Sequence, residues 1–237
     1  MCGKNRFRNL ALLSAGTLAG TLAGTEAASA EGRNGSEAPK KPNILFFLVD
    51  DLGWSDIGCF GSRFHETPNI DRLAEEGVRF TNAYAACHVS SPTRASLMTG
   101  RYPASIRLTD WLPGRKNWPF QRLLNAPVEQ HLPFEEITVA ETLRDNGYAT
   151  AIIGKWHLGK GDSNPLAHGF DEHIPLGYNE GWPQGYYAPF RLNGYEGEEG
   201  EYLTDVMTRE ATKYIEEHKD GPFFLYMSHF AVHDPIQ

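Results

Sequence analysis

The sequence predicts an α/β fold with a mostly parallel central sheet flanked by helices. Continuous apolar runs of strand length alternate along the chain with stretches of helical periodicity; the runs are 43–49, 148–153 and 223–227. Such runs are typical of parallel strands that are covered on both faces. Each run is followed by polar side chains, namely Asp50 and Asp51, Lys155 and His157, and His229 and His233. Because parallel sheets bind ligands at the carboxyl ends of their strands, we expect these three groups to converge at one edge.

The helices are placed by their end signals. Thr67-Pro68 combines an N-cap residue with a proline in the first turn, and predicts a helix that ends at Gly77, followed by a strand over 78–84. Ser91-Pro92 predicts a second helix, which ends at Gly100 and leaves Ser90 just outside its N-terminus.

The second half of the chain follows the same logic. The segment 102–136 is rich in proline and has no clear period, so we expect a surface loop region. Thr138 and Glu141 have the spacing of a capping box and predict a helix that ends near Gly147. Apolar residues at helical spacing over 203–215 predict an amphipathic helix.

The composition is that of a globular protein with an acidic balance. The 237 residues include 22 Lys plus Arg and 30 Asp plus Glu, a formal net charge of −8. This balance argues against nucleic acid and anionic membrane surfaces as partners, because both are usually bound by basic patches. An anionic substrate would need a local cluster of positive groups.

The N-terminal segment predicts export from the cytoplasm. Residues 1–30 contain basic residues, then a short apolar run, then the A-x-A pattern Ala28-Ser29-Ala30, so we expect a signal peptide cleaved after Ala30. The run is too short for a stable membrane span, although an uncleaved anchor is the alternative. Residues 31–41 are polar and contain glycine and proline, as a linker would, and the fold is expected to occupy 42–237.

The cysteines leave two alternatives open. The chain has three, of which Cys2 lies in the expected signal peptide. Cys59 and Cys87 either pair in an oxidising compartment or remain two buried free thiols.

Two short patterns indicate the chemistry. Adjacent carboxylates such as Asp50 and Asp51 at a strand end suit a hard divalent cation, although such a pair also caps turns. Ser90-Ser-Pro-Thr-Arg94 places a small hydroxyl residue beside a helix N-terminus, where backbone N–H groups favour an anion, and adds a permanent positive charge.

Six ordered motifs carry a resemblance to a known family. They are Lys41-Pro-Asn-Ile-Leu, Asp50-Asp51-Leu-Gly-Trp54, Thr67-Pro-Asn-Ile-Asp71, Ser90-Ser-Pro-Thr-Arg94 extended to Pro103, Gly154-Lys-Trp-His-Leu-Gly159 and His233-Asp-Pro235. Together they closely resemble the formylglycine-dependent sulfatases of the alkaline phosphatase-like superfamily, from about Lys41 to the last residue. The resemblance implies hydrolysis of sulfate esters.

The resemblance also implies the role of each site residue. Ser90 would be oxidised to formylglycine by a maturase, because one hydroxyl of the hydrated aldehyde attacks sulfur and the other then expels sulfate. Calcium would be held by Asp50, Asp51 and residue 90, and Arg94 would hold residue 90. Lys155 and His157 would bind sulfate or the hydrated aldehyde, and His233 would protonate the leaving oxygen. Weaker candidates for substrate binding are Asn179 and His229.

The sequence also departs from the family pattern. The metal ligands and the lysine that relatives carry later in the chain have no match before Gln237, so we expect a fragment that lacks the C-terminal part of the fold. Such a chain should bind calcium weakly and hydrolyse little. Serine in place of cysteine at position 90 implies a bacterial protein that is periplasmic or secreted.

Two alternatives to a sulfatase remain at this point. One is a phosphoesterase or phosphonate hydrolase of the same superfamily, and the other is a non-catalytic remnant that binds sulfated glycans. The substrate would be a sulfated small molecule or a sulfated polysaccharide. Loop aromatics could pack on sugar rings or could simply cover the core; they are Trp111, Trp118, Tyr178, Trp182, Tyr186, Tyr187 and Phe190.

Overall fold

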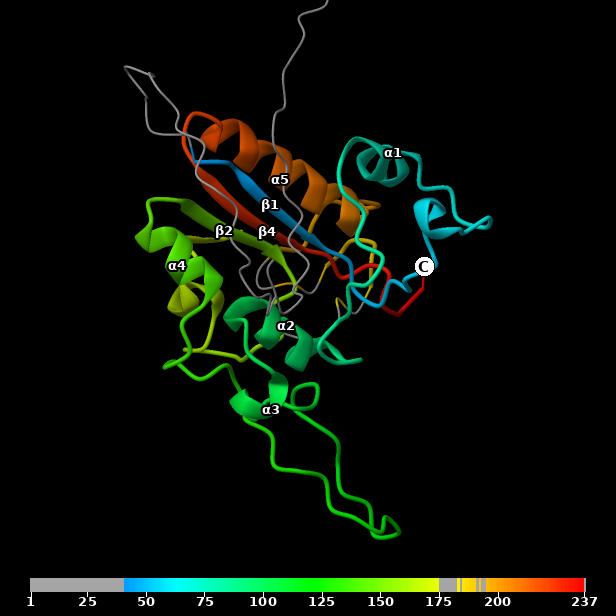
Figure 1. Cartoon of the computed structure of the whole chain (residues 1–237), viewed down its shortest axis with the longest axis vertical. Helices are drawn as coiled ribbons and strands as arrows, with labels where there is room; N and C mark the ends of the chain where they lie inside the picture. The colour runs from blue at the N-terminus through cyan, green and yellow to red at the C-terminus, as the bar shows by residue number, and fades with distance from the viewer. Residues whose placement is uncertain (1–40, 175–182, 184, 191, 193–194, 237) are drawn as a thin grey trace, which may run out of the picture.

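The computed structural model describes residues 41–174, 183, 185–190, 192 and 195–236. In this part of the chain a parallel four-stranded sheet lies between layers of helices (Figure 1). The strands lie in the order β1-β4-β2-β3, with bounds β1 Ile44–Leu48, β2 Ala149–Gly154, β3 Glu172–His173 and β4 Phe223–Ser228. All three neighbouring pairs are parallel, so every carboxyl end lies at the same edge. The predicted α/β class is confirmed.

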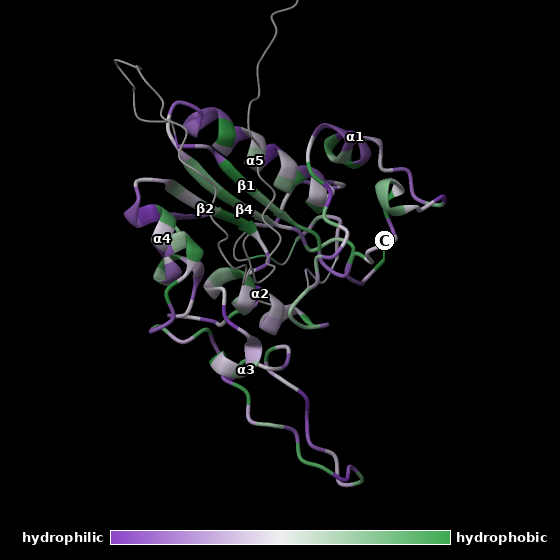
Figure 2. Ribbon diagram, in the orientation of Figure 1, coloured by the Kyte–Doolittle hydropathy of each residue, from purple (hydrophilic) through white to green (hydrophobic). Residues whose placement is uncertain are grey.

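Each face of the sheet has its own apolar core. One face packs against α5 (Leu203–His218) through Ala151, Ile153, Leu225 and Met227. Ile152, Phe224 and Tyr226 belong to the second core, with residues of α2 (Ser90–Thr99) and α4 (Val139–Asp145). Figure 2 shows the apolar strands between the more polar helices. The strands alternate their side chains between two covered faces, as the continuous apolar runs predicted.

The remaining elements are short. They are η1 (Gly58–Phe60), α1 (Pro68–Glu76), α3 (Pro103–Ile106) and η2 (Pro165–His168). Of these, α3 contributes Ile106 to the second core. The long loop between α3 and α4 projects away from the sheet in Figure 1, as expected for 102–136 apart from the single turn of α3. Among the described residues, no helix combines the length and apolar character needed to cross a membrane.

Two expectations about strands were wrong. β1 was expected to be buried on both faces, but it lies at the edge of the described sheet, and the Phe47 side chain is 42% exposed. The segment 78–84 is not a strand, and Val78, Phe80 and Tyr84 are exposed. In the described part of the chain no neighbouring strand bonds to this segment, so alternating apolar residues alone do not form a ladder.

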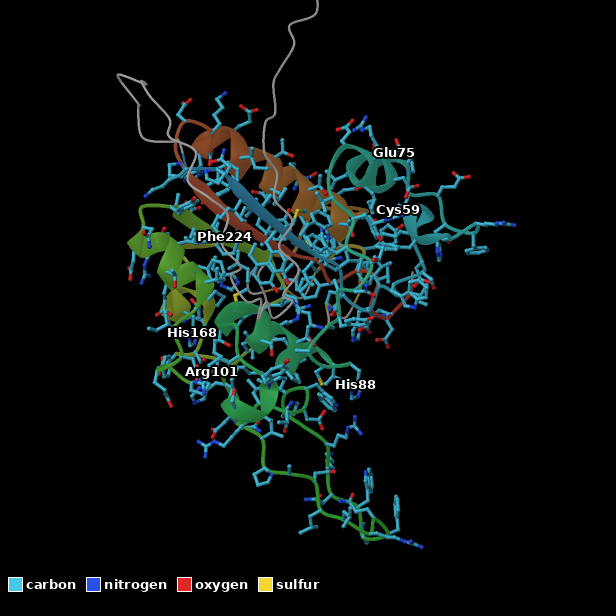
Figure 3. All side chains as sticks on the ribbon, viewed as in Figure 1. Cys59, Glu75, His88, Arg101, His168 and Phe224 are labelled. Carbon is cyan, nitrogen blue, oxygen red and sulfur yellow. The ribbon has the colours of Figure 1, made fainter. Side chains whose placement is uncertain are left out.

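The helix signals were more accurate. Thr138 and Glu141 form the predicted capping box at α4, and Gly100 ends α2 in a left-handed conformation. However, α2 begins at Ser90, so this residue occupies the first helical position and does not lie just outside the helix. Cys59 and Cys87 are free thiols, which answers the open question of their pairing. In Figure 3, Cys59 lies near α1, whereas His88, the neighbour of Cys87, lies beside α2.

Candidate active site

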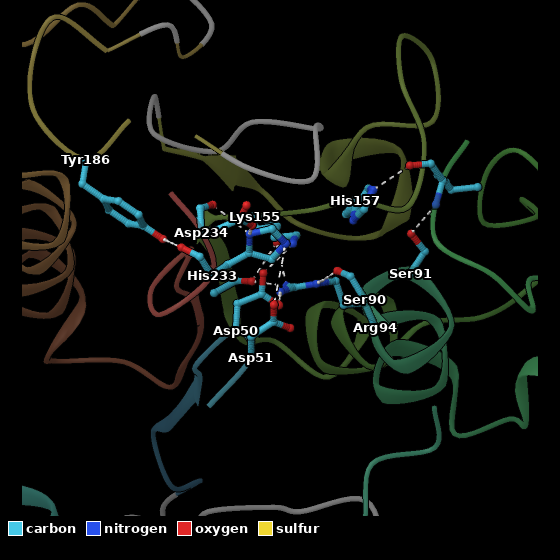
Figure 4. Close-up of polar contacts among 12 residues, drawn as sticks. Asp50, Asp51, Ser90, Ser91, Arg94, Lys155, His157, Tyr186, His233 and Asp234 are labelled. Atoms are coloured by element: carbon cyan, nitrogen blue, oxygen red, sulfur yellow. Dashed lines mark hydrogen bonds and ion pairs between the residues drawn. The ribbon is translucent and has the colours of Figure 1, made fainter. Parts of the chain in front are cut away.

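A pocket of about 900 Å³ lies at the carboxyl edge of the sheet. It is lined by five of the residues that the sequence singled out, Asp51, Ser90, Lys155, His157 and His233. They come from the segments that follow β1, β2 and β4 and from the start of α2 (Figure 4). Members of all three polar groups therefore lie at one edge of the sheet, as the sequence predicted.

Arg94 organises the floor of this pocket. Its guanidinium is 1% exposed, and its Nε donates to the Ser90 hydroxyl oxygen at 2.7 Å. The two terminal nitrogens donate to Asp50 at 3.0 Å and to three further acceptors, which are the Lys155 carbonyl just after β2 and the Tyr226 and Ser228 hydroxyls on β4. A fork of donors fixed on every side cannot move, so Arg94 sets the position of the Ser90 side chain.

Asp50 is the counter-ion of two buried cations. Its two carboxylate oxygens accept from Arg94 and from the Lys155 ammonium. Burial by itself would raise the pKa of Asp50, but the positive charges of Arg94 and Lys155 outweigh it and hold that pKa below its usual value. Burial and the nearby Arg94 charge lower the pKa of Lys155 to about 8, although Asp50 opposes this shift. Behind the Ser90 side chain, two buried cations thus share one buried carboxylate.

The backbone around the pocket holds strained conformations. Asp51 and His157 have φ values of 58° and 55°, in the left-handed region that non-glycine residues rarely adopt. Gly154 ends β2 at φ 101°, and a Cβ there would lie only 2.0 Å from the Ser228 carbonyl oxygen. Only glycine allows β2 to turn at this point and present Lys155 beside β4. Strain of this kind is often kept where it positions functional side chains.

His157 is held as a neutral imidazole in a defined tautomer. Burial, and then the charge of Lys155, lower the pKa of His157 to about 4. Its Nε2 lies 2.9 Å from the Leu112 carbonyl oxygen, and because a carbonyl can only accept, Nε2 carries the proton. Nδ1 is buried and has no hydrogen-bond partner in the described part of the chain. The ring therefore offers an unshared lone pair within a pocket-lining residue.

His233 lies at the rim of the pocket beside the second aspartate. Its Nε2 is 3.7 Å from the Asp51 carboxylate, and its Nδ1 is 2.7 Å from the Asp234 carboxylate. The Tyr186 hydroxyl donates to the His233 carbonyl oxygen at 2.8 Å, which fixes the backbone here (Figure 4). The contacts with the two carboxylates hold the imidazole ring of His233 at the pocket rim.

The two weaker candidates do not join this group. His229 is buried, its ring packs on Phe47 with centroids 4.4 Å apart, and it does not line the pocket. Burial lowers the pKa of His229 to about 4. Asn179 lies outside the described residues.

The described residues do not form a complete calcium site. Both oxygens of Asp50 are engaged by cations, and Asp51 is the one other carboxylate of the predicted pair. No cluster of three or more His, Cys, Asp or Glu suited to a metal occurs in the part of the chain that the structure describes. Calcium takes six to eight oxygen ligands, so Asp50, Asp51 and Ser90 could supply only a part of its shell.

Sequence reasoning missed several contributors to the site. Tyr226 and Ser228 bond to Arg94, the Leu112 carbonyl orients His157, and Asp234 contacts His233. Ser228 and Asp234 could have been found, because they lie directly beside the singled-out His229 and His233. The contact of Leu112 with His157 uses its backbone carbonyl and joins two distant segments, so no sequence pattern predicts it.

Fold and site together define a parallel α/β protein with a pocket at the carboxyl edge of its sheet, lined by Ser90, Lys155, His157 and His233. The chain belongs to the sulfatase family, because the family model described as Sulfatase matches residues 42–237. It is 37% identical over 233 residues to N-acetylgalactosamine-6-sulfatase of Canis lupus familiaris, an alignment that covers 88% of this chain and 43% of that protein.

Solved structures agree with this assignment. The crystal structure of Ps i-CgsB in complex with k-i-k-neocarrahexaose is 35% identical, with a TM-score of 0.69 over 84% of this chain and 47% of the other. A structure of a protein in complex with its substrate D-glucosamine-2-N,6-O-disulfate is 33% identical, with a TM-score of 0.64 over 82% of this chain and 35% of the other. The chain thus spans less than half the length of these relatives.

Proposed function

We propose that the protein to which this chain belongs hydrolyses sulfate esters in the pocket at Ser90. The observation that carries the proposal is the hydrogen bond of 2.7 Å from Arg94 Nε to the Ser90 hydroxyl, in a pocket that the Lys155 side chain also lines. This arrangement fixes one hydroxyl-bearing side chain beside two cations, as attack on an anionic ester requires.

Ser90 would act after oxidation to formylglycine by a maturase. The side chain fits this change because it lines the pocket, is partly exposed and accepts a hydrogen bond that an aldehyde oxygen or its hydrate could also accept. When present, the hydrated aldehyde supplies one hydroxyl that attacks sulfur and a second whose deprotonation allows sulfate to leave. An unmodified serine would end as a stable sulfate ester, so the modification is needed for turnover.

The chain's own residues divide the remaining tasks. Lys155 and the N-terminus of α2, which no side chain caps, would bind the sulfate oxygens. His157, neutral and with a free Nδ1 lone pair, is suited to accept a proton from a hydroxyl at residue 90. His233, which also lines the pocket, would donate a proton to the leaving alcohol.

Asp50 and Asp51 would contribute to a calcium site together with residue 90. The proposal rests on the family resemblance and on the oxygen chemistry of the pair. The other ligands would come from residues beyond those described. No step of the reaction is assigned to the metal.

The proposed function also includes a substrate class and a cellular location. A sulfated sugar, small or polymeric, is the proposed substrate class, in line with the relatives named above. Residues 1–30 would direct export to the periplasm or outside the cell. The phosphoesterase alternative is not favoured, because the relatives of this chain are sulfatases.

Turnover of paired substrates tests this function. The complete protein, co-expressed with a serine-type maturase, should hydrolyse 4-nitrophenyl sulfate much faster than 4-nitrophenyl phosphate. Ser90→Ala should abolish sulfate release while the protein remains folded. Faster phosphate release would support the phosphoesterase, and binding of sulfated glycans with no turnover would support the non-catalytic remnant.

A further inference from the structure

One wall of the pocket is apolar, and it begins beside the anion-binding floor. Val89, Trp111, Leu112 and Pro113 line it, and the Trp111 side chain remains 38% exposed. We infer that Trp111 is the stacking platform of a sugar-ring subsite, which receives the ring that carries the sulfate group. This inference rests on the proposed function and specifies its substrate.

The backbone on both sides of the Trp111 side chain is held by hydrogen bonds. The Leu112 N–H donates to the Ser91 hydroxyl at 3.1 Å, which ties the loop to the first turn of α2. The Leu112 carbonyl accepts from His157, which ties the same residue to the segment after β2. On the other side, the Trp111 N–H donates to the Asp110 carboxylate at 2.9 Å. A platform fixed before binding costs less ordering entropy when the ligand arrives.

The side chains beyond this apolar wall indicate a sugar in preference to an aryl or steroid group. Gln130, His131 and Lys160 also line the pocket and carry hydrogen-bonding groups. His131 is oriented by a contact of 2.9 Å between its Nδ1 and the Leu132 carbonyl, so its Nε2 is left as an acceptor. A ring with an apolar face and a rim of hydroxyls matches both kinds of lining, whereas a wholly apolar group would desolvate the polar side chains.

Trp118, the other tryptophan of this loop, lies away from the pocket. Trp118 lies at the far end of the same loop, where it stacks on Phe120 with centroids 6.0 Å apart, and it does not line the pocket. The two residues share one loop but differ in their distance from Ser90. Trp118→Ala is therefore a matched control for Trp111→Ala.

Ligand-observed NMR on the full chain tests the subsite. The probes are N-acetylgalactosamine 6-sulfate, unsulfated N-acetylgalactosamine, inorganic sulfate and 4-nitrophenyl sulfate. Trp111→Ala should weaken binding of the sulfated sugar roughly three- to tenfold and remove saturation transfer to the ring protons of both sugars. Affinity for inorganic sulfate should not change. Trp111→Phe should keep most of the sugar affinity, and Trp118→Ala all of it.

The other outcomes separate this inference from the proposed function. Unchanged sugar binding by Trp111→Ala would overturn the subsite and leave the sulfatase function standing. An equal loss of inorganic sulfate would show that Trp111 only supports the anion site. A larger loss for 4-nitrophenyl sulfate than for the sugar would assign the wall to aryl groups. If inorganic sulfate does not bind at all, the proposed function fails, and the unsulfated sugar still decides whether Trp111 contacts a ring.

Discussion

Arg94 is the residue on which the geometry of the site depends most. It is buried, it pairs with Asp50, and it bonds to Ser90, to the Lys155 carbonyl after β2 and to β4. Removal of such a group leaves a buried carboxylate with one partner fewer and several acceptors unsatisfied. The same contacts that position Ser90 therefore also stabilise the fold.

Arg94→Met should lower the free energy of unfolding by about 3–5 kcal/mol. The surface pair Arg72–Glu76 offers a control, because both side chains are exposed and Arg72→Met should cost less than about 1 kcal/mol. Urea unfolding of both variants measures the difference. Equal losses would contradict the central position given to Arg94.

Buried histidines should make the protein sensitive to acid. Burial lowers the pKa of His157 and of His229 to about 4, below the ordinary value of 6.5. The unfolded chain therefore binds more protons between pH 4 and 6.5, and stability rises with pH across this window and is lost as pH falls. Each histidine contributes up to about 3 kcal/mol over the whole window.

His229→Phe should remove about half of this pH dependence. Phe47→Leu is the matched control, since it alters the ring contact with His229 but removes no titrating group. It should lower stability by a similar amount at every pH. Free energies of unfolding measured from pH 4 to 7 test this prediction. If their dependence on pH were unchanged in His229→Phe, His229 would not be one of the groups responsible for it.

At the scale of elements, the capping box of α4 links the helix to the segment before β3. The Thr138 hydroxyl accepts from the Glu141 N–H at 3.1 Å and donates to the His168 carbonyl at 2.7 Å. In turn, the Glu141 carboxylate accepts a hydrogen bond from the Thr138 N–H at 2.7 Å. One buried side chain thus satisfies a helix end and joins it to a distant part of the chain.

Thr138→Ala should destabilise the protein by about 1–2 kcal/mol. Thr142→Ala is the comparison, because that hydroxyl donates to the Thr138 carbonyl one turn earlier, and its loss should change stability by less than about 0.5 kcal/mol. Thermal unfolding of the Thr138→Ala and Thr142→Ala variants measures both losses of stability. A Thr142 variant as unstable as the Thr138 variant would argue against the capping role.

Local signals predicted the elements better than they predicted their neighbours. Thr138, Pro68 and Gly100 fixed helix ends because caps act within a single turn. The segment 78–84 was wrongly assigned to a strand. A strand forms only when it pairs with a neighbouring strand, and the local sequence does not indicate whether such a neighbour is present. Arg94 and Lys155 were found from motifs, whereas the Leu112 and Ser228 contacts depend on the packing of distant segments.

At the scale of the whole molecule, the described residues supply part of the proposed active site. The cations, the Ser90 side chain and the pocket are in place, but the carboxylates do not complete a shell for calcium. Chains related to this one are about twice its length. The 237-residue chain should therefore retain anion binding better than metal binding.

Calcium titration of the 237-residue chain tests this imbalance. With so few oxygen ligands, the dissociation constant should lie near or above about 1 mM, the weak end of the range for protein sites. Asp51→Asn should reduce binding further, because it removes the less engaged carboxylate. Calorimetry that found micromolar affinity would contradict the incomplete site.

The central claim is that residue 90 is the converted nucleophile of a sulfatase, and peptide mass spectrometry tests it most directly. The protein would be isolated from its native source and the peptide that contains residue 90 sequenced by fragmentation. We predict a residue two hydrogen atoms lighter than serine, which reacts with an aldehyde reagent. Unmodified Ser90 throughout an intact protein that still releases sulfate would contradict the account.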